Sequence, residues 1–183
     1  MLTEAERETL LDIARHSIAY GLQHGRAATV TVADYSPALQ EIKATFITLQ
    51  IDGELRGCIG TLQAHRPLVE DVADNAYAAA FRDPRFPMLT KAEYERLQYH
   101  ISILSTPEPM KFKDEQDLLS QLRPGVDGLV LEEGRFRGTF LPQVWDSLPD
   151  SKSFLRHLKQ KAGLSPDYWS STIKVQKYTV EEF

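Results

Sequence analysis

The feature that most constrains the fold is a strand–turn–strand pattern that occurs twice. Residues 53–59 (GELRGCI) align with residues 134–140 (GRFRGTF), 81 residues further along the chain. Each segment follows a run rich in β-branched and apolar residues and precedes a helical pattern and then another strand. The sequence therefore predicts an internal duplication of a ββαβ unit, with repeat one at about residues 43–105 and repeat two at about residues 126–180.

Local signals assign this chain to the α+β class. Asp52-Gly53 suits the positive φ angles of a type I′ turn and joins predicted strands at 45–51 and 54–60. Thr3 and Glu6 have the spacing of a capping box and start an extra N-terminal helix. We expect mainly antiparallel sheet with flanking helices, formed by two βαβ-type repeats that share one sheet. This would be a single domain over residues 1–183, in which the repeats could form two subdomains.

Composition disfavours several classes of protein. The net charge is −5 and no basic cluster stands out, so we do not expect a nucleic-acid partner. One cysteine excludes an internal disulfide framework, and the five histidines lack ligand spacing, so no metal site is expected. The sequence shows no signal peptide and no apolar run of membrane-spanning length. We expect a cytoplasmic protein that does not enter the membrane and keeps its thiol reduced.

Cys58 is the first candidate for chemistry. A reactive thiol needs a nearby cation, a helix N-terminus or a histidine. Strand alternation would place Arg56 on the same face, and the helix that begins near Pro67 could point its N-terminus at the sulfur. His65 and His100 are the nearest candidate bases. The alternative is that Cys58 is a buried, small apolar residue, which is the commoner role of a free cysteine.

A proline-stiffened loop is the second candidate. Its Arg85 could bind a carboxylate or phosphate, with Phe86 as a wall and Asp83 orienting the guanidinium. Alternatively, Phe86 fills the core while the arginine and aspartate form a weak surface ion pair. Repeat two has no clear counterpart of this loop and carries Thr139 at the position of Cys58. Features that are unique to repeat one are the better functional candidates.

The Arg-Gly dipeptide, by contrast, occurs in both repeats, at Arg56-Gly57 and Arg137-Gly138. A glycine at the end of a strand suits a bulge or a close approach between two backbones. A structural role therefore explains these two glycines better than ligand binding does.

With these residues, the chain resembles the AMMECR domain family, whose prokaryotic members are called AmmeMemoRadiSam system protein A. The matching segments are 55–60 (LRGCIG), Asp83, 85–87 (RFP), 101–105, 137–142, 161–164 and Trp169. Met88 departs from the pattern, since many relatives have proline there. The resemblance implies an α+β fold with two βαβ-like repeats and an extra N-terminal helix. The candidate site contains Cys58 as the catalytic residue and, for substrate binding, Arg56, Gly57, Gly60, Asp83, Arg85 and Phe86.

The resemblance implies no established reaction. Prokaryotic genes of the family often accompany, or are fused to, genes for a Memo-type protein and a radical SAM enzyme, which suggests a shared pathway. One hypothesis is a small-molecule-binding or enzymatic component of that pathway, with its site around Cys58 and Arg85. The other is a non-catalytic scaffold that docks such partners. The sequence does not specify the substrate, the cofactor or the oligomeric state.

Overall fold

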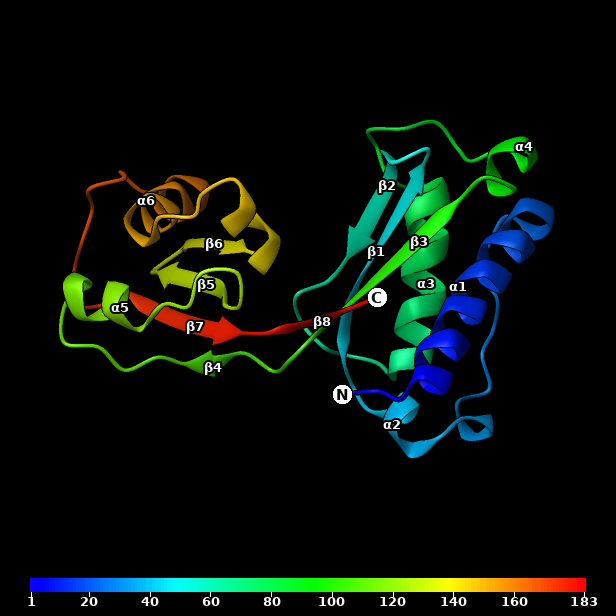
Figure 1. Cartoon of the computed structure of the whole chain (residues 1–183), viewed down its shortest axis with the longest axis horizontal. Helices are drawn as coiled ribbons and strands as arrows, with labels where there is room; N and C mark the ends of the chain where they lie inside the picture. Colours follow the sequence, from blue (N-terminus) through cyan, green and yellow to red (C-terminus); the bar gives the residue numbers. More distant parts are fainter. The chain divides into compact units, whose positions relative to one another are not determined.

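The computed structural model describes all 183 residues and has an α+β fold, as the sequence predicts. The chain forms two compact units, residues 1–104 with 181–183 and residues 105–180 (Figure 1). Strands pair into two separate four-stranded sheets, so the expectation that both repeats share one sheet is wrong. No helix has the length and apolar character needed to cross a lipid bilayer.

Unit one contains the first sheet and the N-terminal helix. Its elements are α1 (Glu4–His24), η1 (Val32–Asp34), α2 (Pro37–Gln40), β1 (Ala44–Ile51), β2 (Glu54–Gly60), α3 (Leu68–Phe81), α4 (Lys91–Tyr94) and β3 (Gln98–Leu104). The C-terminal strand β8 (Val180–Glu182) completes the sheet in the order β2-β1-β3-β8. Helix α3 lies against β1 and β2, and α1 packs on α3 (Figure 1). The predicted capping box of Thr3 and Glu6 starts α1.

The hairpin of unit one contains an irregularity that the sequence pattern does not reveal. Asp52 and Gly53 have φ angles of 54° and 81°, as a type I′ turn requires. Further along, Leu49 pairs with Gly57 while the next residue, Gln50, pairs with Leu55. Arg56 therefore has no partner on β1 and is the extra residue of a β-bulge. A bulge breaks side-chain alternation and re-aims the side chain of the extra residue.

A buried carboxylate fastens α3 to β1. Asp71 has no solvent exposure, and its Oδ2 accepts hydrogen bonds from the backbone N–H and the hydroxyl of Thr45 at 2.9 and 2.6 Å. The Asn75 amide and the Arg66 guanidinium also donate to Asp71. A buried charge is stable only when its hydrogen-bonding capacity is used in this way.

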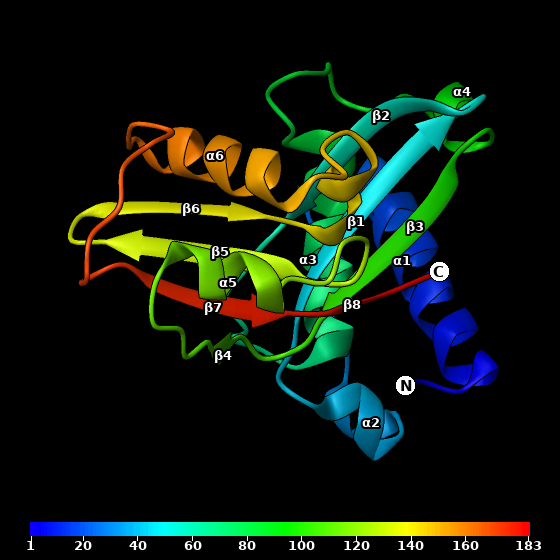
Figure 2. The same ribbon diagram turned by 60° about the vertical axis from the view of Figure 1, so that its left-hand side comes forward.

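Unit two repeats the same order of elements. It contains β4 (Glu108–Pro109), α5 (Glu115–Gln121), β5 (Gly128–Glu133), β6 (Phe136–Phe140), η2 (Pro142–Asp146), α6 (Ser151–Ala162) and β7 (Lys174–Tyr178). The sheet order is β4-β7-β5-β6, and α6 lies along β6, as Figure 2 shows. The indole of Trp145 stacks on the ring of Phe154 in the core, with ring centroids 3.7 Å apart.

The two repeats agree in topology as well as in sequence. In both, the second strand of the hairpin is a sheet edge and the strand after the helix pairs with the first strand. Gly57 and Gly138 occupy equivalent positions against α3 and α6. A Cβ on Gly57 would lie 2.1 Å from the carbonyl oxygen of Ala79, and one on Gly138 would lie 2.9 Å from the nitrogen of Ala162. The structural interpretation of both glycines is confirmed, since only glycine permits these helix–strand contacts.

Candidate functional site

Cys58 lies on β2, an edge strand of the first sheet, and is partly exposed. Its neighbour Gly57 faces α3, so the Cys58 side chain points to the other face of the sheet. There its Sγ lies 3.2 Å from the Oγ1 of Thr48, the residue opposite it on β1. This environment does not match the alternative of a buried apolar cysteine.

The loop that follows α3 closes over the free edge of β2. The carboxylate of Asp83 is buried and accepts the backbone N–H of Cys58 at 2.9 Å. The same carboxylate accepts the Nε and Nη2 of Arg85 at 3.0 and 2.8 Å, and also the Arg85 backbone N–H. The Arg85 guanidinium and these N–H donors hold the pKa of Asp83 well below its usual value. Because Asp83 is buried, this pair is not the surface ion pair of the structural alternative.

Arg85 interacts with Cys58 as well as with Asp83. The pKa of Arg85 is raised, mainly by its hydrogen bonds to Asp83, with a smaller contribution from the negative charge of a Cys58 thiolate. The structure thus brings Cys58, Asp83 and Arg85 together. More than half of the Arg85 side chain, 55%, remains open to solvent.

Arg56 occupies a different position from the one that strand alternation predicts. As the extra residue of the bulge, it points to the segment between α3 and β3. Its Nε and Nη2 donate to the carboxylate of Glu93 at 2.8 and 3.2 Å, and Nη2 also donates to the carbonyl of Pro87. Arg56 and the Thr90 N–H lower the pKa of Glu93 to about 2. The third nitrogen of the guanidinium, Nη1, is buried and has no hydrogen-bond partner.

Phe86 joins the two arginines. Its ring centroid lies 5.7 Å from the guanidinium carbon of Arg56 and 5.5 Å from that of Arg85. Both distances fit cation–π contacts. Phe86 is partly exposed and is not a member of the apolar cluster of unit one. The alternative in which it fills the core is therefore wrong.

The predicted helix N-terminus is not at the thiol. Residue 57 touches Ala79, near the C-terminal end of α3, and the loop just beyond that end binds Cys58. The N-terminal end of α3 instead donates the Leu68 N–H to the carbonyl of Glu41. A helix C-terminus carries partial negative charge and does not favour a thiolate. The cationic neighbour of the sulfur is therefore Arg85.

The two candidate bases differ in their surroundings. His65 is exposed in the loop after β2, where its Nδ1 lies 3.0 Å from the carbonyl of Gln63. His100 lies on β3 directly opposite Thr48, the residue that also faces Cys58. Gly60 ends β2, where a Cβ would lie 2.3 Å from the carbonyl oxygen of Thr45, so a packing constraint accounts for this glycine too.

Comparison with known proteins identifies the family. The AMMECR1 family model matches residues 11–183. The chain belongs to the AMMECR1 family. A relative from Methanothermobacter thermautotrophicus is 34% identical, covering 100% of this chain and 95% of the relative. One from Sulfolobus acidocaldarius is 39% identical, covering 92% and 77%. The crystal structure of an uncharacterized protein from Pyrococcus horikoshii aligns with a TM-score of 0.84 at 35% identity, over 96% of this chain and 89% of that one.

The AMMECR1 match confirms the resemblance read from the sequence, and the function of the family members compared here is not specified by their names. In this AMMECR1-family chain, sequence reasoning missed Glu93 and Thr48 as neighbours of the site. Thr90 and Glu93 do form the capping box that their spacing indicates. Nothing in that spacing shows that the same carboxylate also binds Arg56, because this contact depends on the bulge.

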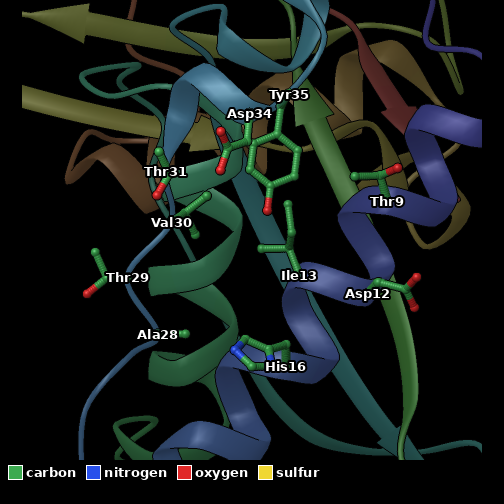
Figure 3. A pocket seen from close by; sticks show the side chains of 10 residues that line it. All are labelled: Thr9, Asp12, Ile13, His16, Ala28, Thr29, Val30, Thr31, Asp34 and Tyr35. Atoms are coloured by element: carbon green, nitrogen blue, oxygen red, sulfur yellow. The ribbon is translucent and has the colours of Figure 1, made fainter.

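A separate groove lies elsewhere on unit one of this AMMECR1-family chain. It has a volume of about 410 Å³ and is bordered by α1 and the segment 28–35. Figure 3 shows the Tyr35 ring reaching toward Ile13 inside it, with Asp12 on the outer side of α1. Asp12 is paired with Arg15. None of the site residues predicted from the sequence lines this groove.

Proposed function

We propose that this chain is a small-molecule-binding or enzymatic component of a pathway shared with Memo-type and radical SAM proteins. Its site is the group of residues around Cys58 and Arg85. The observation that carries the proposal is Nη1 of Arg56, a buried cationic donor without a hydrogen-bond partner. Such a group is costly unless an acceptor is bound to it for part of the protein's working cycle. A ligand oxygen would supply that acceptor.

Charge balance indicates which ligand fits. Asp83 neutralises Arg85, and Glu93 neutralises Arg56, so the site has no strong net charge before a ligand binds. The donors left over are Nη1 of Arg56 and the solvent-exposed side of the Arg85 guanidinium, with the Phe86 ring in contact with both arginines. A small molecule with a carboxylate, phosphate or carbonyl oxygen and an apolar part matches these groups.

Cys58 supplies the possible chemistry. Its sulfur is partly exposed and lies close enough to the Arg85 cation to interact with it. A nearby cation favours the thiolate, the form that acts as a nucleophile. A thiol with this role must stay reduced, so the proposal places the protein in the cytoplasm.

Thermal shift measurements test the binding proposal. Wild type, Arg85→Ala and Cys58→Ser are each titrated with sodium phosphate, phosphate monoesters and a series of mono- and dicarboxylates. Binding raises the midpoint of unfolding by mass action. We expect at least one compound class to stabilise wild type and Cys58→Ser, with most of the stabilisation lost in Arg85→Ala. Equal stabilisation of all three variants, or no stabilisation by any compound, contradicts the proposal.

A docking role is the second candidate, and two exposed apolar side chains favour it. Leu55 is 41% exposed and Met88 is 64% exposed. They flank Arg56 and Pro87, which are joined by a hydrogen bond of 2.8 Å, so both lie beside the site. A pull-down with purified Memo-type and radical SAM proteins tests this role. Capture that is lost in Leu55→Ser/Met88→Ser supports docking, and failure to retain either protein contradicts it.

A further inference from the structure

We propose that Thr48 and His100 are positioning residues for Cys58, forming with it a polar row across three adjacent strands that leads the thiol proton to the imidazole. This inference rests on the proposed role of Cys58 as a nucleophile. It extends the site from the edge strand β2 across β1 to β3.

Strand register places the three side chains in one row. Thr48 on β1 is opposite Cys58 on β2 and, on its other side, opposite His100 on β3. Residues that are directly opposite in an antiparallel sheet project from the same face. The Thr48 hydroxyl already lies 3.2 Å from the Cys58 sulfur, with either atom able to donate.

Distances across the sheet give the threonine its role. Adjacent strands are about 4.8 Å apart, so backbones two strands apart are separated by roughly 10 Å. The imidazole of His100 therefore cannot be the direct partner that a cysteine–histidine pair normally requires. A hydroxyl between them both accepts and donates a proton. The His100 ring forms no other hydrogen bond within the protein, so its nitrogens are free for this role.

Repeat two provides an internal comparison. The equivalent row there is Thr139 on β6, Val130 on β5 and Gln176 on β7, as its register shows. The central residue, Val130, is only 1% exposed and cannot relay a proton. The Thr139 hydroxyl instead donates to the carbonyl of Leu129 at 2.8 Å. The fold therefore does not require Cys, Thr and His at these three positions.

Other charged groups near the row are few. Asp83 and Arg85 lie at the Cys58 end and neutralise each other. At the other end, Ile101 and Phe183 exchange two backbone hydrogen bonds, which places Glu182 opposite Ser102 on the His100 face. A carboxylate beside the imidazole favours its protonated form.

The proton transfer is balanced within the row. The S–H proton of Cys58 passes to Oγ1 of Thr48 while the Thr48 hydroxyl proton passes to a ring nitrogen of His100. The products are a thiolate and an imidazolium, with the hydroxyl regenerated. The thiolate then faces the Arg85 guanidinium and accepts a hydrogen bond from the Thr48 hydroxyl.

Alkylation by iodoacetamide, followed from pH 5 to pH 10, tests the row in the full-length chain. Wild type is compared with Thr48→Val, Thr48→Ser and His100→Gln, and with Ser102→Ala as a matched change on the same face outside the row. We expect the wild-type rate to have its midpoint below the ~8.5 of an ordinary cysteine. Thr48→Val and His100→Gln should each raise that midpoint by about one pH unit, which lowers the rate at pH 7 about tenfold.

The conservative and matched variants separate a positioning role from a structural one. Thr48→Ser and Ser102→Ala should retain the wild-type midpoint, and thermal unfolding verifies that each variant is folded. A low wild-type midpoint that neither Thr48→Val nor His100→Gln changes overturns the row and leaves the proposed nucleophile intact. A wild-type midpoint at or above ~8.5 overturns the nucleophile itself, and the row with it.

Discussion

The backbone N–H of Cys58 donates a hydrogen bond of 2.9 Å to the buried carboxylate of Asp83. This contact satisfies an outward-pointing donor of an edge strand, which would otherwise be open to pairing with another chain. The same carboxylate holds the Arg85 guanidinium through two further hydrogen bonds. Asp83 therefore links the stability of β2 to the electrostatics of the thiol.

Replacing Asp83 with alanine should destabilise unit one by about 2–3 kcal/mol, because a buried, charged acceptor of several hydrogen bonds is lost. Urea unfolding measures this loss, and faster amide exchange at Cys58 localises it. Arg85→Ala is the matched control, since its side chain is 55% exposed and its ion pair should contribute less than about 1 kcal/mol. Equal losses in the two variants would show that the effect comes from the ion pair alone.

The equivalent glycines should differ in their tolerance of alanine. A Cβ at Gly57 would lie 2.1 Å from a backbone oxygen of α3, while the closest atom at Gly138 would be 2.9 Å away. Overpacking of this kind costs about 1–3 kcal/mol and more where backbone must move. We expect Gly57→Ala to lower the free energy of unfolding by more than 3 kcal/mol and Gly138→Ala by about 1–2 kcal/mol. Chemical denaturation of both variants checks the order, and the reverse order would contradict it.

Glu93 should make the protein sensitive to acid. Arg56 lowers the pKa of Glu93 from 4.5 to about 2 in the folded state. The stabilisation is therefore complete above pH 4.5 and is lost as the pH falls toward 2, because the unfolded state binds the proton first. Glu93→Gln should be less stable at pH 7 and should show a shallower decline in stability over this pH range. Denaturation curves at successive pH values test this, with the exposed carboxylate variant Glu95→Gln expected to follow wild type.

Lys159 in unit two is completely buried and paired with Glu115, with the Trp169 ring 5.5 Å from its ammonium group. Removing the partner of a buried charge costs more than replacing the charge by an apolar side chain of similar size. We expect Glu115→Ala to destabilise the protein by about 2 kcal/mol and Lys159→Met to have a smaller effect. Thermal unfolding of the two variants decides this, and a larger loss for Lys159→Met would show that the ion pair is net stabilising.

Local elements could be predicted from the sequence with good agreement because their signals are short-range. The Asp52-Gly53 turn needs only two residues that accept positive φ, and the capping boxes at Thr3 and Thr90 need only a partner three residues away. The duplication was visible because each repeat had to preserve a glycine at the point where its strand meets a helix. Family membership followed from the same segments.

The sequence by itself thus determined the α+β class, the hairpins, the capped helices and the residues of the candidate site. Only the tertiary structure decided how these residues are used. A one-residue bulge turned Arg56 from Cys58 to Glu93, and the direction of α3 brought its C-terminal end to the thiol. Strand register placed Thr48 between Cys58 and His100. The physical reason is that bulges, helix direction and register depend on packing between distant segments, which spacing along one chain does not encode.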